Sequence, residues 1–132
     1  MATVLVVDDE PSMRKALRAF FERAGFTVLE ADSSAAAKRI FAEGPGADAV
    51  VCDVLMPGET GIAFYDALLE TSPRLADRVV FLTGAAGDPR VHAPIEQRGV
   101  PLISKIDDLR LVVDAVRLSL LKRPSMVGKV PG

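Results

Sequence analysis

Short apolar runs alternate along the chain with segments in which apolar residues recur every three or four positions. The runs occupy residues 4–7, 49–52, 79–82 and 100–103, and each stops at or just before a polar residue. Continuous apolar runs of this length are typical of buried strands in a parallel sheet. A shorter strand is expected over residues 26–30, so the pattern predicts five strands.

The segments between these runs have the period of amphipathic helices. The clearest one starts at Pro11 and stops before Gly25, two residues that favour the first turn and the C-terminal cap of a helix. Further helices are expected over about residues 34–42, 61–69 and 107–121. Strands that alternate with helices predict a doubly wound α/β domain with a parallel sheet.

The segment that precedes the last apolar run allows two interpretations. Pro89 suits the first position of a helix, with Asp88 as its N-cap. Pro94 would then lie beyond the first turn, where a proline removes a backbone hydrogen bond and clashes with the preceding turn. Residues 84–93 could instead form a loop, followed by a short helix over residues 94–98.

Length, composition and charge narrow the classes of protein. The chain has 132 residues, of which 49% are hydrophobic, as expected for one globular domain. Its formal net charge is −2, which argues against direct binding to nucleic acid because such domains are usually basic. No apolar stretch approaches the roughly 20 residues that span a bilayer, so no membrane association is expected.

The two ends of the chain and its single cysteine bear on the location of the protein and on the bounds of the domain. A strand that begins by Thr3 leaves no room for a signal peptide, and a single cysteine fits a reducing compartment, so a cytoplasmic location is expected. Residues 1–121 are expected to form the domain. Residues 122–132, which contain two prolines, are expected to be a flexible tail or the start of a linker.

Polar side chains lie where four of the predicted strands end. The carboxyl ends of parallel strands meet at one edge of the sheet, where α/β proteins of this kind bind ligands. Carboxylates suit Mg²⁺, a carboxylate can act as the nucleophile in phosphoryl transfer, and an ammonium can neutralise phosphoryl charge. The residues concerned are Asp8, Asp9, Asp53, Thr83 and Lys105.

These polar residues belong to four short motifs, which are Val7-Asp8-Asp9-Glu10, Asp53-Val54-Leu55-Met56-Pro57-Gly58 with Gly61, Leu82-Thr83-Gly84, and Lys105. Each motif is weak alone, but the ordered set is specific and extends over about residues 3–121. In this set of motifs the chain resembles the receiver domain of bacterial two-component response regulators.

The resemblance implies a role for each residue. Asp53 accepts a phosphoryl group from the phosphohistidine of a sensor histidine kinase or a phosphotransfer protein. Asp9, Asp53 and the backbone carbonyl of Leu55 bind Mg²⁺, which Mn²⁺ could replace, and Asp8 acts partly through water. The side chains that contact the phosphoryl group are those of Thr83 and Lys105.

The resemblance also implies a fold and a mode of action. The fold is a flavodoxin-like (βα)5 sandwich of three layers with strand order 2-1-3-4-5. The domain is a signalling phosphoacceptor that catalyses only its own phosphorylation and dephosphorylation, not an enzyme for other substrates. The alternative is a degenerate receiver that binds partners without phosphorylation, but such domains usually lack the acidic residues that are present here.

Three other classes of protein fit the motifs less well. A phosphatase of the haloacid dehalogenase type would need a second aspartate two positions after Asp53, where this chain has Leu55. An FMN-binding flavodoxin would need a phosphate loop after the first strand, and the acidic residues there would repel phosphate. The chain contains no G-x-x-x-x-G-K-[ST] loop of an NTPase.

Two positions depart from the usual receiver pattern, and the last helix has an unusual outer side. Lys105 is followed by Ile106 instead of proline, so the peptide between them is expected to be trans. Leu102 stands where most receivers carry a switch aromatic. A second apolar side on the last helix predicts contact with another copy of the chain or a neighbouring domain. The side chains concerned are Leu111, Leu118 and Leu121.

Several conspicuous residues are expected to have no special role. Cys52 is interpreted as an inert, buried strand residue. His92 has no second metal ligand at a suitable spacing and is expected at the surface. A solvated helix face is favoured over a partner-binding patch for three basic residues of the first helix. They are Arg14, Lys15 and Arg18.

Overall fold

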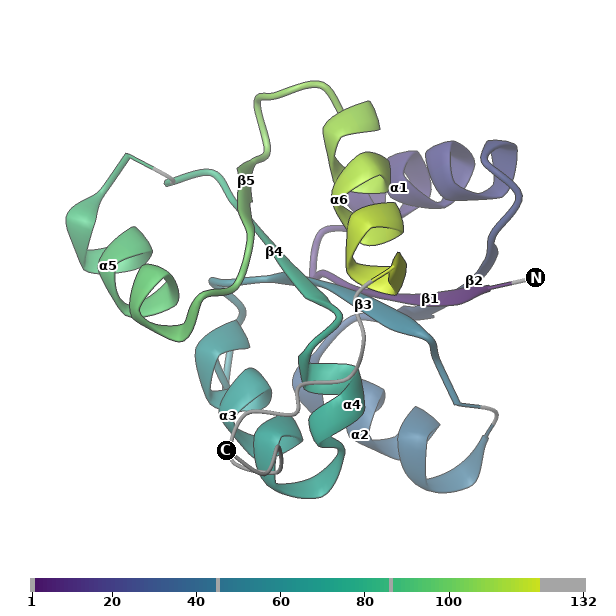
Figure 1. The fold of residues 1–132 in the computed structure, drawn as a ribbon, viewed down its shortest axis with the longest axis horizontal. Helices are drawn as coiled ribbons and strands as arrows, with labels where there is room; N and C mark the ends of the chain where they lie inside the picture. Colours follow the sequence, from purple (N-terminus) through teal and green to yellow (C-terminus); the bar gives the residue numbers. More distant parts are fainter. Residues whose placement is uncertain (1, 45, 86, 122–132) are drawn as a thin grey trace, which may run out of the picture.

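A computed structural model describes residues 2–44, 46–85 and 87–121. Within these residues, five strands form one parallel sheet in the order β2-β1-β3-β4-β5 (Figure 1), which is the predicted flavodoxin-like order. The tail expected at 122–132 lies outside the described residues. The strands are β1 (Thr3–Val7), β2 (Thr27–Ala31), β3 (Ala49–Asp53), β4 (Val79–Thr83) and β5 (Leu102–Ser104).

Helices connect the strands and cover both faces of the sheet, which gives the three predicted layers (Figure 1). In the described residues none of them is long and apolar enough to cross a membrane. The helices are α1 (Pro11–Arg23), α2 (Ser34–Glu43), α3 (Gly61–Thr71), α4 (Pro73–Ala76), α5 (Pro89–Arg98) and α6 (Arg110–Leu121).

Two apolar cores lie on opposite faces of the sheet because neighbouring strand residues point in opposite directions. Val4 and Val6 of β1 belong to the core beneath α1 and α6. Leu5 and Val7 belong to the core beneath the helices on the other face. The central strands are therefore buried on both sides, as their continuous apolar sequences predicted.

The segment before β5 forms a helix in spite of its internal proline. α5 begins at Pro89, and the carboxylate of Asp88 caps it by accepting a hydrogen bond from the N–H of Arg90 (2.9 Å). The helix continues through Pro94. The interpretation of residues 84–93 as a loop is therefore wrong.

Long-range contacts hold the second half of α5 in place. Ile95 is buried in the core, and Arg98 makes two hydrogen bonds to the carboxylate of Asp66 in α3 (2.9 and 2.8 Å). These contacts offset the loss of one backbone hydrogen bond at a proline, which sequence pattern alone does not reveal.

Two other helical regions also differ from the sequence pattern. α3 runs to Thr71, beyond the expected end near residue 69, and Pro73 then opens the one-turn helix α4, which was not predicted. α6 begins at Arg110, three residues later than expected, because residues 105–109 form a turn between β5 and the helix.

Candidate functional site

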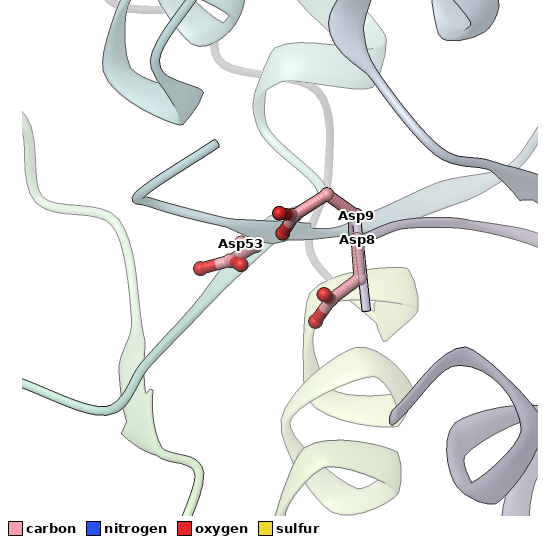
Figure 2. Close-up of side chains that lie close together, drawn as sticks. All are labelled: Asp8, Asp9 and Asp53. Atoms are coloured by element: carbon pink, nitrogen blue, oxygen red, sulfur yellow. The ribbon is translucent and has the colours of Figure 1, made fainter. Parts of the chain in front are cut away.

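Three carboxylates gather where β1 and β3 end (Figure 2). Asp8 follows β1, Asp9 continues toward α1, and Asp53 is the last residue of β3. One oxygen atom from each carboxylate lies within 4.8 Å of the other two. Asp8 and Asp53 are only 1% and 4% exposed, whereas Asp9 is exposed. The structure thus brings together the three acidic residues that the sequence pattern singled out.

Strand register and local hydrogen bonds explain this convergence. Val7 pairs with Cys52, so β1 and β3 end at the same level of the sheet. The N–H of Asp8 donates to the carbonyl of Ala31 (3.1 Å), and Oδ1 of Asp8 accepts from the N–H of Glu10 (2.8 Å). The chain therefore turns sharply after β1 while both acidic side chains stay at the edge of the sheet.

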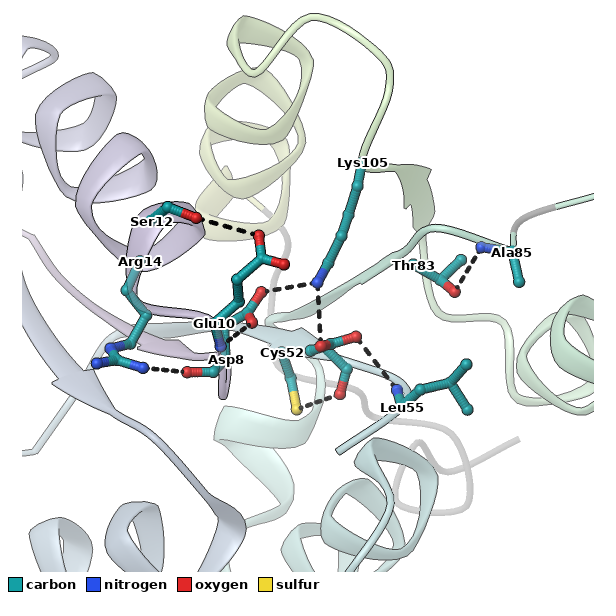
Figure 3. A network of polar contacts seen from close by, with 10 residues as sticks. Asp8, Glu10, Ser12, Arg14, Cys52, Leu55, Thr83, Ala85 and Lys105 are labelled. Carbon is teal, nitrogen blue, oxygen red and sulfur yellow. Dashed lines mark hydrogen bonds and ion pairs between the residues drawn. The ribbon is translucent and has the colours of Figure 1, made fainter. Parts of the chain in front are cut away.

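Lys105 reaches this cluster from the turn after β5 (Figure 3). Its Nζ lies 3.0 Å from Oδ2 of Asp53 and 3.1 Å from Oδ2 of Asp8. Burial alone would lower the pKa of Lys105, but the two carboxylates together outweigh it and raise that pKa. The ammonium thus neutralises part of the negative charge in the cluster.

The surroundings of Asp53 raise its pKa. Burial is the main cause of its raised pKa, and the charge of Asp8 adds to it. The hydrogen bond and charge of Lys105 and the N–H of Leu55, which donates to Oδ1 of Asp53 (3.2 Å), act in the opposite direction. Cys52 is fully buried, as predicted, and burial raises the pKa of its thiol.

Thr83 ends β4 beside the cluster and is fully buried. Its Oγ1 accepts a hydrogen bond from the N–H of Ala85 (3.0 Å), and its carbonyl accepts one from the N–H of Lys105 (2.9 Å). Figure 3 shows the hydroxyl turned toward the loop after β4. The hydroxyl proton remains available to a group that enters the site, because Oγ1 serves only as an acceptor in this contact.

One oxygen atom of the cluster fits a bound cation especially well. Oδ2 of Asp8 is buried, and among the described residues it has no hydrogen-bond partner, although the ammonium of Lys105 is nearby. The contact with this ammonium leaves part of the bonding capacity of the buried oxygen unmet, which is costly, and a divalent ion would relieve that cost. The donors are all oxygen atoms, which suits Mg²⁺ or Mn²⁺.

Gly61 closes the site from the side of α3. It is the first residue of that helix, after the N-cap Thr60, whose hydroxyl accepts from the N–H of Ala63 (3.2 Å). A Cβ at Gly61 would overlap the carbonyl oxygen of Asp53 and lie 3.0 Å from Cα of Val54. Glycine therefore allows α3 to start directly against the strand end that carries the buried carboxylate.

Arg14 belongs to the site, and its interpretation as part of a solvated helix face is wrong. Its side chain is only 18% exposed and forms an ion pair with Glu30 of β2 (3.4 Å). Its Nη1 donates to the backbone carbonyl of Asp8 (2.7 Å) (Figure 3). Lys15 is exposed, as expected. The only signal in the sequence is an arginine one turn into the helix after the acidic pair, and its partner on β2 is not apparent locally.

A family model for the response regulator receiver domain matches residues 4–117. This range covers most of the chain and contains all five polar residues of the cluster. The chain belongs to the response regulator receiver family. It is thus a receiver domain of two-component signalling, as its motifs predicted.

Relatives and solved structures agree with this assignment. The chain is 30% identical over 124 residues to the response regulator receiver protein CpdR of Brucella abortus, and covers 98% of it. It is 32% identical over 123 residues to a putative transcriptional regulator of Pseudomonas aeruginosa, and spans 57% of that protein's length. The receiver domain of a signal transduction histidine kinase from Syntrophus aciditrophicus superposes with a TM-score of 0.80 at 26% identity, over 95% of this chain and 96% of that one.

The two departures from the receiver pattern lie next to the site. The described residues contain no cis peptide bond, so the peptide between Lys105 and Ile106 is trans, as expected. Lys105 nevertheless reaches Asp53, while Ile106 is 91% exposed. Leu102 is half-buried and packs against the core on the α2–α5 face, so this receiver has no aromatic ring at the usual switch position.

Proposed function

We propose that this receiver accepts a phosphoryl group on Asp53 from a phosphohistidine of a sensor kinase or phosphotransfer protein, in a Mg²⁺-dependent reaction. One observation carries the proposal. Asp53 is a nearly buried carboxylate whose Oδ2 lies 3.0 Å from an ammonium, and two further carboxylates lie beside it. A carboxylate placed in this way has both a cationic partner and a set of oxygen ligands for a metal.

Each residue of the site has a separate role in the proposed reaction. A carboxylate oxygen of Asp53 forms the new bond to phosphorus as the bond between phosphorus and the histidine nitrogen breaks. The nitrogen leaves with the electron pair of that bond, and no general base is required because the nucleophile is already a carboxylate. Lys105 and the hydroxyl of Thr83 stabilise the charge on the phosphoryl oxygens by an ion pair and a hydrogen bond.

The acidic cluster and the loop after β3 would hold the metal. Asp9, Asp53 and the carbonyl of Leu55 supply the direct ligands in this proposal, and Asp8 contributes partly through water. Mg²⁺ bound there would neutralise charge on the transferred group and on the cluster. The buried Oδ2 of Asp8, which has no hydrogen-bond partner among the described residues, supports this arrangement.

The rest of the chain defines the scope of the proposal. Residues 1–121 would form the receiver domain, a cytoplasmic signalling module without an activity on other substrates. The chain spans 57% of the length of the Pseudomonas aeruginosa relative. A second copy of the chain or a neighbouring domain would bind the outer side of α6. The exposed side chains there are Leu111, Leu118 and Leu121.

Phosphorylation by acetyl phosphate, followed by intact-mass measurement, tests the proposal. The wild type should gain one phosphoryl group in the presence of Mg²⁺ and none after chelation. Asp53→Asn should gain none under either condition. Labelling of Asp53→Asn to the wild-type level would refute the assignment of the acceptor. A wild type that stays unlabelled would favour the degenerate receiver that binds partners without phosphorylation.

A further inference from the structure

We propose that Arg14 is a positioning residue for the metal site, because it holds the peptide between Asp8 and Asp9 in the orientation that binds the cation. This inference rests on the proposed Mg²⁺ dependence and adds to it a residue that does not touch the metal. Arg14 lies in α1, whereas the carboxylates that it would position lie in the preceding loop.

The guanidinium of Arg14 is held at two points. Its Nε lies 3.4 Å from Oε1 of Glu30 on β2, and its Nη1 donates to the carbonyl of Asp8 at 2.7 Å (Figure 3). The donors of a guanidinium lie in a rigid, planar fork. The contact with Glu30 therefore fixes the direction from which Arg14 approaches the carbonyl of Asp8.

Fixing this carbonyl also fixes Asp9. A peptide unit is planar, so the direction of the Asp8 carbonyl sets the direction in which the chain enters Asp9. Asp8 is held independently by the contacts of its N–H with Ala31 and of its Oδ1 with Glu10. Asp9 is exposed, and its carboxylate depends on the backbone for its position.

The charge of Arg14 alone predicts the opposite effect. A positive charge near a cation site repels the cation, so removing Arg14 should strengthen Mg²⁺ binding if only charge mattered. Removing a residue that orients metal ligands should weaken binding, typically by 10–100-fold. The sign of the change therefore separates the two explanations.

Arg18 provides a matched control. It also lies in α1 and forms a short ion pair with the same carboxylate, that of Glu30. In the part of the chain that the structure describes, its side chain contacts Glu30 and Glu22 and makes no hydrogen bond to Asp8. Arg18→Met thus removes one positive charge and one ion pair of Glu30 but leaves the contact between Arg14 and Asp8.

The experiment is a calorimetric titration of the metal-free domain with Mg²⁺ for the wild type, Arg14→Met and Arg18→Met. We expect Arg14→Met to bind about tenfold more weakly and Arg18→Met to bind like the wild type. Affinity in Arg14→Met equal to or above that of the wild type would overturn the inference. An equal loss in Arg18→Met would do the same, because it would show that only the ion pair with Glu30 matters.

Amide hydrogen exchange without metal separates this inference from the proposed function. Arg14→Met should speed exchange at the N–H groups of Asp9 and Glu10, and Arg18→Met should not. If the wild type binds no Mg²⁺, the proposed metal dependence fails, and unchanged exchange in Arg14→Met would then overturn the positioning role as well. Arg14→Lys keeps the positive charge but lacks the planar set of guanidinium donors, and it replaces Arg14→Met in the titration if that variant does not fold. It should still bind Mg²⁺ more weakly than the wild type, and wild-type affinity would overturn the inference.

Discussion

The acceptor edge of the sheet buries polar side chains, whereas the β5–α6 side of the molecule exposes apolar ones. The acceptor edge is the end of β1, β3 and β4, where Asp8, Asp53 and Thr83 are all buried. The β5–α6 side, residues 102–121, carries Ile106, which at 91% exposure is the most exposed large apolar side chain among the described residues. Burial strengthens the interactions of charged groups, whereas an exposed apolar surface is available to a partner.

Lys105 is the residue that joins these two regions. Its N–H donates to the carbonyl of Thr83 (2.9 Å), so β5 is tied to β4 at this point. Its ammonium then extends into the acceptor edge and contacts both Asp53 and Asp8. The side chain of Lys105 thus connects the buried carboxylates of the acceptor edge to the β5–α6 side.

The largest effect is expected from Lys105→Ala. Removing one hydrogen-bond donor that stabilises the charge of a transition state costs roughly 10²–10³-fold in rate. Phosphorylation of Asp53 by acetyl phosphate should therefore slow by roughly 10²-fold, as measured by the rate of mass increase. Ile106→Ala is the matched control, since it changes the next, exposed residue and should leave the rate unchanged. Equal rates in wild type and Lys105→Ala would break the proposed link between the two regions.

Gly61→Ala should damage the acceptor edge without adding or removing charge. Alanine is normally preferred to glycine within a helix, yet here its Cβ would overlap the carbonyl of Asp53. Overpacking of this kind costs about 1–3 kcal/mol, so the free energy of unfolding should fall by about that amount in urea denaturation. Gly46→Ala is the control, because a Cβ there would meet no atom within 4 Å. An unchanged stability in Gly61→Ala would show that the strand end can move freely.

Asp53→Asn should stabilise the metal-free domain at neutral pH. Burial raises the pKa of Asp53 in the folded state, so the folded domain binds this proton more tightly than the unfolded chain does. Ionisation of Asp53 as the pH rises through the carboxyl range therefore costs stability. We expect the variant to be more stable than the wild type, and this gain should vanish at acidic pH, where Asp53 is protonated in both states.

With Mg²⁺ bound, the wild type should be more stable than Asp53→Asn. A ligand at 100 times its dissociation constant stabilises the folded state by about 2.7 kcal/mol, and the wild type has the complete set of ligands. Thermal unfolding with and without Mg²⁺ measures both effects. A metal-free Asp53→Asn that melts below the wild type at neutral pH would contradict the argument, because it would mean that the bond to Lys105 outweighs the cost of burial.

The acceptor edge could be predicted from sequence because its signals are local. The polar residues follow directly after buried strands, and the parallel sheet necessarily brings Asp8 and Asp53 to one edge. Thr83 and Lys105 were found in the same way. The pattern did not show that the hydroxyl of Thr83 turns toward Ala85, because the direction of a side chain depends on the conformation of the following loop.

Other features depend on partners that are distant in the sequence, and the pattern could not predict these. The path of α5 through Pro94 relies on the contact between Arg98 and Asp66 of α3. The burial of Arg14 relies on Glu30 of β2. In each case the arginine and its carboxylate are distant in the sequence, so the pattern left helix and loop open before β5 and favoured a solvated face for Arg14.

The smallest effect on stability, and a clear effect on association, is expected from Leu111→Glu with Leu118→Glu. These side chains are 49% and 65% exposed on α6, and substitutions at exposed positions usually change stability by less than about 0.5 kcal/mol. If the outer side of α6 binds a second copy of the chain, two carboxylates there should weaken that contact strongly. Analytical ultracentrifugation of the wild type and the double variant, with and without acetyl phosphate and Mg²⁺, measures the association.

The control for this last prediction is Leu69→Glu on α3, where a leucine of similar exposure (45%) lies away from the β5–α6 side. It should associate like the wild type, so that only the position of the new charge differs between the variants. A wild type that stays monomeric at high concentration, phosphorylated or not, would exclude the second copy. The remaining partner for the exposed leucines of α6 would then be a neighbouring domain. The same substitutions in a longer chain would test that contact.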